Sequence, residues 1–186
     1  MMAPVRIRDA LMFAVLMTAL HLGQPYTREE DIEDITKFYH EGAKLRTLYT
    51  TIEANKCNVD RVTTARGQRI QIERFSVAGG KTTSSLILEG LFTNKRFAIR
   101  NVPWDAMDLH QKNNAQYYLF ERLYRTCDRN TCGIFYVSRH NHRGGQDYEI
   151  RVKVGSPQNN NDCPECFEAL QKYTRKAVKT ACNHKG

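Results

Sequence analysis

The chain has 186 residues, and its 28 lysines and arginines outnumber its 20 acidic residues, which gives a formal net charge of +8. This length is enough for one domain with its own core. The basic residues are scattered and no helix-turn-helix or RNA-binding motif accompanies them, so the charge indicates a solvated basic surface and not a nucleic-acid site.

Residues 1–23 have the pattern of a signal peptide. Arg6 and Arg8 form a basic start, and residues 10–22 (ALMFAVLMTALHL) form an apolar run of the usual length. That run is too short to cross a bilayer comfortably, and no second long apolar run follows. We therefore expect residues 24–186 to form a single secreted domain with no membrane contact. The alternative is a buried N-terminal helix.

A helix is predicted after this segment. Thr27 and Glu30 make a capping box, and Gly42 provides the end. Between them, helical spacing on one face predicts a helix over residues 28–41 with these apolar residues buried: Ile32, Ile35, Phe38 and Tyr39.

Beyond Gly42 the hydrophobic period changes to two, which is typical of strands. Consecutive short strands joined by short turns imply antiparallel pairing. Eight such strands can close into a barrel that encloses one small ligand. The predicted strands are Lys44–Glu53, Cys57–Thr64, Gln68–Val77, Thr83–Thr93, Lys95–Val102, Ala115–Thr126, Cys132–Ser138 and Asp147–Val154.

The C-terminal segment predicts a helix packed on the outside of this barrel. Residues 165–181 are amphipathic, with these side chains on one stripe: Phe167, Leu170, Tyr173, Ala177 and Val178. The opposite side of the helix carries four basic residues, Lys172, Arg175, Lys176 and Lys179. They are interpreted either as a solvated face or as a glycosaminoglycan-binding surface.

Six cysteines follow the signal segment. An even number in a secreted chain implies disulfides, with 15 possible connectivities. One alternative is a zinc site made by Cys127, Cys132, Cys163 and Cys166. Another is redox chemistry at the CxxC of Cys163 and Cys166, although no βαβ pattern surrounds it. We expect disulfides, and no metal or other cofactor.

This order of helix, eight strands, helix and distant cysteines resembles a lipocalin. Three passages are similar to the lipocalins of tick saliva, the histamine-binding-protein family. They are residues 57–60 (CNVD), residues 132–137 (CGIFYV) followed by 148–150 (YEI), and Cys163-x3-Phe167 with Ala181-Cys182 at the end.

The resemblance implies a secreted salivary protein that sequesters a host mediator and so suppresses inflammation. Members of this family hold histamine, serotonin or lipid mediators such as leukotrienes in the barrel, and some bind complement protein instead. The family's disulfides imply the pairs Cys57–Cys182 and Cys132–Cys163, which leaves Cys127 and Cys166 to pair. We expect a monomer.

The last strand supplies the main candidate site. If Ile150, Val152 and Val154 pack under the C-terminal helix, then Glu149 and Arg151 point into the barrel. Glu149 also lies where amine-binding members keep an acidic ligand contact. The alternative is that Glu149 pairs with Arg151 or Lys153 on a solvated face.

Other residues leave the ligand open. The family's aspartate after the strand cysteine is Gly133 here, and Trp104, the only tryptophan, lies outside the family's tryptophan position. A carboxylated lipid is the other small-molecule hypothesis, with Arg151, and also Arg74, Arg100 or Arg122, as its anchor. The aromatic residues proposed to line the site around the lipid tail are Phe75, Phe97, Tyr117, Phe120 and Phe135.

We expect a binding protein and not an enzyme. No nucleophile motif, phosphate loop or paired carboxylates occur, and His140 and His142 read as part of a surface loop, although they could bind metal. Two further hypotheses stand beside the small-molecule one. The first is a lipocalin that inhibits a host defence protein through its surface, and the second is a cationic surface binder.

Overall fold

The computed structural model describes residues 33–52, 57–94, 102–139, 147–155 and 162–181, apart from the side chains of residues 115–117. The predicted signal peptide lies outside these ranges. Within them, no helix has the length and apolar character needed to cross a membrane.

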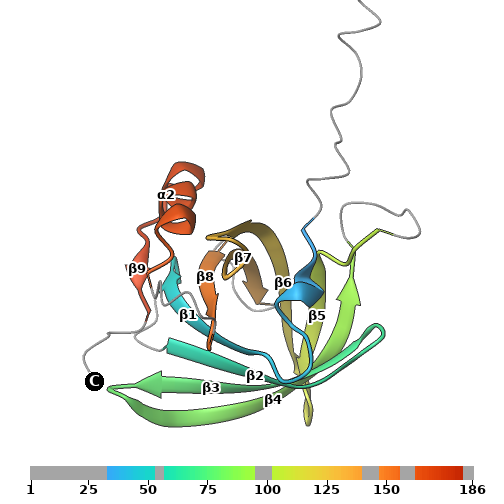
Figure 1. The fold of residues 1–186 in the computed structure, drawn as a ribbon. Coiled ribbons are helices and arrows are strands. Elements are labelled where there is room, and N and C mark those ends of the chain that lie inside the picture. The colour runs from blue at the N-terminus through green and yellow to red at the C-terminus, as the bar shows by residue number, and fades with distance from the viewer. Residues whose placement is uncertain (1–32, 53–56, 95–101, 140–146, 156–161, 182–186) are drawn as a thin grey trace, which may run out of the picture. The chain divides into compact units, whose positions relative to one another are not determined.

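Eight antiparallel strands form a closed barrel (Figure 1). Each strand pairs with the next along the chain, and β1 pairs with both β8 and β2, which closes the sheet. Closure leaves no unpaired edge among these eight strands. Their bounds are β1 Lys44–Thr50, β2 Cys57–Arg66, β3 Arg69–Ala78, β4 Lys81–Thr93, β5 Ala106–Gln111, β6 Asn114–Cys127, β7 Cys132–Arg139 and β8 Asp147–Lys153.

The eight-stranded barrel confirms the predicted architecture, but one strand differs. The sequence AMDLHQ of β5 was not predicted as a strand, because it lacks the β-branched and aromatic residues that favour one. It forms because β4 and β6 pair with it on both sides. The predicted strand Lys95–Val102 falls outside the described residues, except for Val102, which is not in a strand. The first strand ends at Thr50, before the predicted Glu53.

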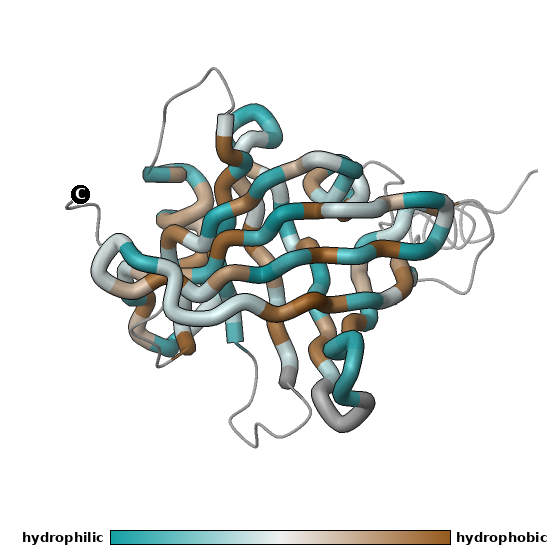
Figure 2. The backbone as a smooth tube through the Cα atoms, turned by 90° about the horizontal axis from the view of Figure 1, so that it is seen from below, coloured by the Kyte–Doolittle hydropathy of each residue, from teal (hydrophilic) through white to brown (hydrophobic). Residues whose placement is uncertain are grey.

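Alternation along the strands separates the interior from the surface, as the changes between teal and brown in Figure 2 show. On β3, Ile70, Ile72 and Arg74 are buried while their neighbours are partly exposed. The buried members come from seven of the eight strands and from residues before β1, and together they form one continuous cluster that fills much of the barrel interior.

The predicted helix over residues 28–41 is wrong within the described residues. From residue 33 onward it is only a short 3-10 turn, η2 Ile35–Lys37, capped by the Asp34 carboxylate, which accepts from the Thr36 amide at 3.0 Å. The predicted apolar residues Ile35, Phe38 and Tyr39 are all fully buried. They form no helical stripe, because the chain turns inward here and packs all three into the barrel core.

Within the described residues, the α-helix α2 Pro164–Tyr173 lies outside the barrel against β6 and β7 (Figure 1). It is shorter than the predicted 165–181, because the backbone becomes extended at Thr174. Residues 179 and 180 instead form a short strand, β9 Lys179–Thr180, on β1. Val154 was predicted to pack under the helix but lies beyond β8 and is half exposed. The barrel face that does pack with α2 includes Ile134, Ile150 and Val152, which share an apolar cluster with Leu170 of the helix.

Two disulfides fasten the start of α2 to the β6–β7 hairpin. Cys127 pairs with Cys166 and Cys132 pairs with Cys163, with Cα–Cα distances of 5.5 and 6.0 Å. These are the pairs implied by the resemblance, and they correct the zinc and redox alternatives, because all four sulfur atoms are bonded to one another in pairs. Cys57 is also in a disulfide, and its predicted partner Cys182 lies outside the described residues.

Candidate ligand-binding site in the barrel

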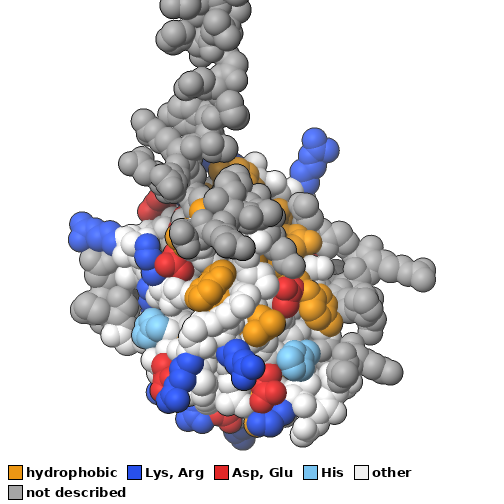
Figure 3. All heavy atoms as spheres, turned by 90° about the vertical axis from the view of Figure 1, so that its right-hand side faces the viewer, with side chains coloured by type: hydrophobic (Ala, Val, Ile, Leu, Met, Phe, Trp, Pro, Cys, Tyr) orange, Lys and Arg blue, Asp and Glu red, His pale blue; other side chains and the backbone are white. Residues whose placement is uncertain are grey.

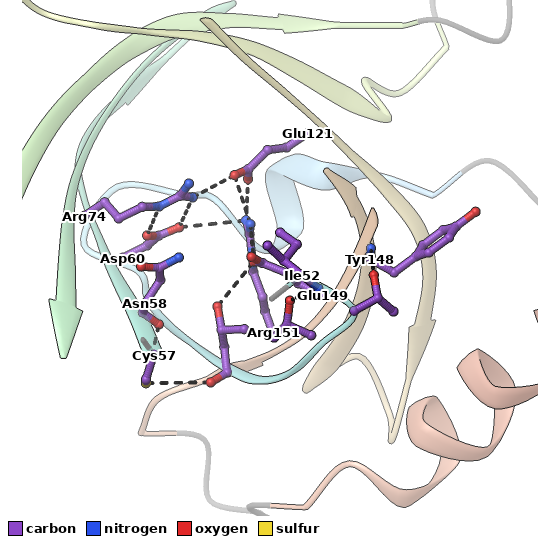
Figure 4. Close-up of polar contacts among 12 residues, drawn as sticks. Ile52, Cys57, Asn58, Asp60, Arg74, Glu121, Tyr148, Glu149 and Arg151 are labelled. Atoms are coloured by element: carbon purple, nitrogen blue, oxygen red, sulfur yellow. Dashed lines mark hydrogen bonds and ion pairs between the residues drawn. The ribbon is translucent and has the colours of Figure 1, made fainter. Parts of the chain in front are cut away.

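Five charged side chains occupy inward positions on the barrel strands. Asp60 lies on β2, Arg74 on β3, Glu121 on β6, and Glu149 and Arg151 on β8 (Figure 4). Asp60, Arg74 and Glu121 stand in alternating series that otherwise supply the apolar core, and all five side chains belong to residues that are at most 5% exposed. With the phenol of Tyr39 they form what we call the barrel cluster.

Arg74 joins the β2 and β6 carboxylates. Its Nε and Nη2 donate to the two oxygens of Asp60 at 2.6 and 2.7 Å, a bidentate arrangement. Nη2 also lies 2.8 Å from Glu121 Oε1. Because Arg74 makes ion pairs with two carboxylates, it links the two sides of the barrel.

Arg151 occupies the centre of the cluster. Its Nη1 and Nη2 donate to the two oxygens of Glu121, the second at 2.9 Å. Its Nε and Nη2 donate to Glu149 Oε2 at 2.9 and 2.7 Å. The guanidinium also lies over the Phe135 ring, 4.9 Å from its centroid, so a cation–π contact covers one face.

Tyr39 connects the two halves of the cluster. Its hydroxyl donates to Asp60 Oδ2 at 3.0 Å and accepts a hydrogen bond from Arg151 Nη1. Burial raises the pKa of the Tyr39 phenol well above its usual value, so the phenol stays neutral and can keep both roles.

The five charged groups do not balance. Burial alone opposes ionisation of Glu121, but Arg151 and Arg74 lower its pKa to about 2. Burial also opposes the charge on Arg151, yet Glu121, Tyr39 and Glu149 raise its pKa well above the usual value. With all five groups ionised, three carboxylates face two guanidinium groups, which leaves one excess negative charge in the barrel cluster.

The hydrogen bonds to Glu149 are distributed unevenly between its two oxygens. The Thr47 hydroxyl donates to Glu149 Oε2 at 3.3 Å, and the Arg151 guanidinium donates to the same oxygen through Nε and Nη2. Among the described residues, the hydrogen bonds given to Glu149 thus converge on one oxygen, and Oε1 receives none of them. A carboxylate oxygen in this setting can accept an N–H group from a ligand.

Apolar packing closes the barrel beneath the cluster. Phe38 and Tyr39 both meet Phe135 edge to face, with ring centroids 5.5 and 5.9 Å apart. All three side chains are fully buried. The cluster is thus the polar layer above an aromatic floor, and the floor is held in place by the segment that follows η2.

Some of the predicted site residues meet inside the barrel, and the side chains of others lie outside the described residues. Glu149, Arg151 and Phe135 come together in the barrel, and the predicted inward parity of β8 is therefore observed. The solvated-face alternative for Glu149 is wrong, although its pairing with Arg151 is present. Tyr117 belongs to β6, but its side chain, like all of Phe97 and Arg100 and the loop with His140 and His142, lies outside the described residues.

Three predicted lining residues lie on the outer face. Phe75 follows the inward Arg74 and therefore points out, where Arg61 lies over its ring. Arg122 pairs with Asp105, its Nε donating at 2.8 Å. Phe120 and Arg122 help to line an outer hollow of about 150 Å³. The prediction failed because the apolar residues Leu119 and Leu123 set the inward parity of β6.

Sequence reasoning missed Asp60, Glu121 and Tyr39 as parts of the site. A signal was present, because Asp60 shares its parity with Val62, and Glu121 lies between Leu119 and Leu123 at spacings of two. When every second residue of a strand is apolar and one residue in that series is charged, the charged side chain is expected to point into the barrel. For Tyr39 no such signal existed, since it lies in an irregular segment.

Comparison with known proteins supports the fold through structure alone. No protein-family model matches the chain, and no curated protein matches its sequence. Among solved structures, the siderocalin Ex-FABP matches with a TM-score of 0.50 and 10% identity, covering 78% of this chain and 95% of that one. The chain has the lipocalin fold.

Two further solved structures match this chain. A serotonin complex of AM182 has a TM-score of 0.48 and 14% identity, and the match covers 87% of this chain and 93% of that one. Apocrustacyanin C1 has a TM-score of 0.47 and 13% identity, and the match covers 80% of each chain.

Proposed function

We propose that this lipocalin is a secreted protein that sequesters a small organic cation, a biogenic amine such as histamine or serotonin, inside its barrel. Residues 1–23 would be removed as a signal peptide, and residues 24–186 would act as a monomer. Two disulfides between strands and helix support an oxidising compartment. In the salivary setting that the sequence resemblance implies, holding a host amine would suppress inflammation.

The excess negative charge of the barrel cluster carries this proposal. A buried charge without a counter-ion is unfavourable, and among the described residues only Arg74 and Arg151 form ion pairs with the carboxylates of the cluster. A monovalent ammonium group would bring the cluster to neutrality. The ligand therefore contributes the missing member of an ion network that the protein has already arranged.

Glu149 Oε1 is the proposed acceptor of the ammonium group. Arg151 and Thr47 hold the carboxylate through its other oxygen, which fixes the direction of Oε1 before a ligand enters. The aromatic floor at Phe135 lies beneath the same guanidinium. This arrangement supports Glu149 as the ligand contact, because a carboxylate that is already oriented lowers the entropy cost of binding.

The same contacts argue against a carboxylated lipid. Arg151 already donates to Glu121, Glu149 and Tyr39, so a ligand carboxylate would have to displace one of these acceptors. It would also raise the excess charge of the cluster from one negative charge to two. The amine is the ligand class that improves the charge balance, and the lipid is the class that worsens it.

Isothermal titration with paired ligands tests this proposal. Histamine and serotonin are compared with a leukotriene and with neutral analogues that lack the ammonium group. We expect saturable binding of an amine near one per chain and no binding of its neutral analogue. Glu149→Gln should weaken amine binding about 10–100-fold, the worth of one charge-assisted hydrogen bond of about 1.5–3 kcal/mol.

A matched control separates the site from general effects of charge. Glu73 pairs with Arg61 on the outer face, and Glu73→Gln removes the same charge there. We expect amine affinity to stay within twofold of the original protein. Equal losses in the two variants, or tighter binding of the leukotriene than of every amine, would overturn the proposal.

A further inference from the structure

A second pocket lies at the end of the barrel where the chain enters β1 and leaves β8. It has a volume of about 310 Å³ and is formed by two segments that are tied together, because the Val154 amide donates to the Lys44 carbonyl at 2.9 Å. Gly42 and Gly155 both have positive φ, which lets the two segments turn sharply around the opening. The lining is His40, Gly42, Ala43, Lys44, Lys153, Val154 and Gly155.

The charged groups of this lining are all basic. Lys44 is exposed, Lys153 is half buried, and His40 is exposed beside them. The acids of neighbouring segments are engaged elsewhere. Glu41 lies 3.6 Å from Arg66, Asp34 accepts from Thr36, and Glu33 accepts from Thr126.

Lys153 is the most unusual member. Its ammonium lies over the Phe38 ring, 4.3 Å from the centroid, and none of the ion pairs between described residues includes it. Burial and then the nearby Lys37 lower its pKa from the usual value. A partly desolvated ammonium with no carboxylate partner is the state that a bound anion would relieve.

This pocket is separate from the barrel cluster. Glu149, Arg151 and Lys153 follow one another on the same face of β8, but Phe38 lies under the Lys153 ammonium and is fully buried. The charged residues of the barrel cluster form ion pairs with one another, and Lys153 takes part in none of these pairs. Figure 3 views the side of the barrel on which η2 lies, where basic side chains are interspersed with acidic and apolar ones.

We propose that this pocket binds a sulfate or phosphate ester. A tetrahedral ester group offers several acceptor oxygens to the basic residues that line the pocket, Lys44, Lys153 and His40, whereas a carboxylate offers only two. The volume exceeds that of the anion alone, so the anion would be carried on a larger body such as a sulfated sugar. The occupant adds no charge to the barrel cluster, so this site is independent of amine binding.

Titration of the lysine side chains by NMR tests the site directly. Inorganic sulfate, inorganic phosphate and a sulfated heparin disaccharide are each added to the purified protein. We expect saturable binding, with an upward shift in the pKa of Lys153 and no shift for Lys81, an exposed lysine at the start of β4. Tighter binding of the disaccharide than of sulfate would identify a sugar ester, and the reverse order a free ion.

Variants complete the experiment. Lys153→Met and Lys44→Met should each weaken anion binding about tenfold or more, while Lys81→Met, which removes the same charge, should change it less than twofold. Lys44 is exposed, so its variant keeps the test valid if Lys153→Met does not fold. Amine binding at the barrel cluster should be unaffected in all three. An equal loss in all three variants, or an unchanged pKa of Lys153 at saturating anion, would overturn the proposal.

Discussion

The two faces of β8 carry opposite kinds of packing. Inward, Glu149 and Arg151 join a buried ion network, whereas outward, Ile150 and Val152 pack with α2 and the two disulfides. Buried ion pairs are weak sources of stability, because desolvation offsets much of their attraction. The apolar, cross-linked side therefore stabilises a barrel whose interior holds a charged cluster beside its apolar core, and alternation along β8 lets one strand contribute to both faces.

The largest expected effect comes from breaking the inner side. Arg151→Met leaves Glu121 and Glu149 buried with less compensation, and we expect the free energy of unfolding to fall by about 3–5 kcal/mol. Urea unfolding followed by circular dichroism measures it. Arg61→Met is the matched control, since Arg61 pairs with Glu73 on the outer face with half of its side chain exposed, and it should cost about 1 kcal/mol or less. Similar losses in the two variants would contradict the difference between the faces.

The outer side is tested by removing one disulfide. The double variant Cys132→Ala with Cys163→Ala opens a loop closed over 31 residues, and we expect a loss of about 2–4 kcal/mol in the free energy of unfolding. Amine affinity should stay close to that of the intact protein at temperatures where the variant is folded. If affinity falls while the variant is still folded, the two faces are coupled and not separate.

Acid sharpens the comparison, because Glu121 on the inner side has a lowered pKa. The pKa of Glu121 is lowered to about 2 in the folded protein, so the folded state resists protonation that the unfolded state accepts. Its contribution to stability is present above about pH 4.5 and is lost as the pH falls towards 2. Glu121→Gln should remove up to about 1.4 kcal/mol per pH unit from the slope of stability against pH in this window. An unchanged slope in Glu121→Gln would refute the assignment.

Much of the fold could be predicted because it depends on local pattern. The period of two gave seven of the eight strands, and the apolar stripe of residues 167 and 170 placed α2 on the barrel. Strand β5 could not be found this way, since its neighbours impose its conformation. The helical spacing at Ile35, Phe38 and Tyr39 was misleading, because three residues that plug the end of a barrel need no common helical face.

The site was harder to predict than the fold. Alternation on β8 was sufficient to place Glu149 and Arg151 inside, because one face was clearly apolar. The partners Asp60, Arg74 and Glu121 come from three other strands, and their meeting depends on how those strands pair around the barrel. That information is held in long-range register, which no single stretch of sequence contains.

Mapping the amine-binding site by NMR tests the central claim most directly. Histamine or serotonin is added to isotopically labelled protein, and the carboxyl and guanidinium resonances are followed. The account predicts that the largest shifts occur at the Glu149 carboxylate and the Arg151 guanidinium, with small shifts at Lys153 and on the outer face. Saturable amine binding whose shifts leave the barrel cluster unchanged would contradict it.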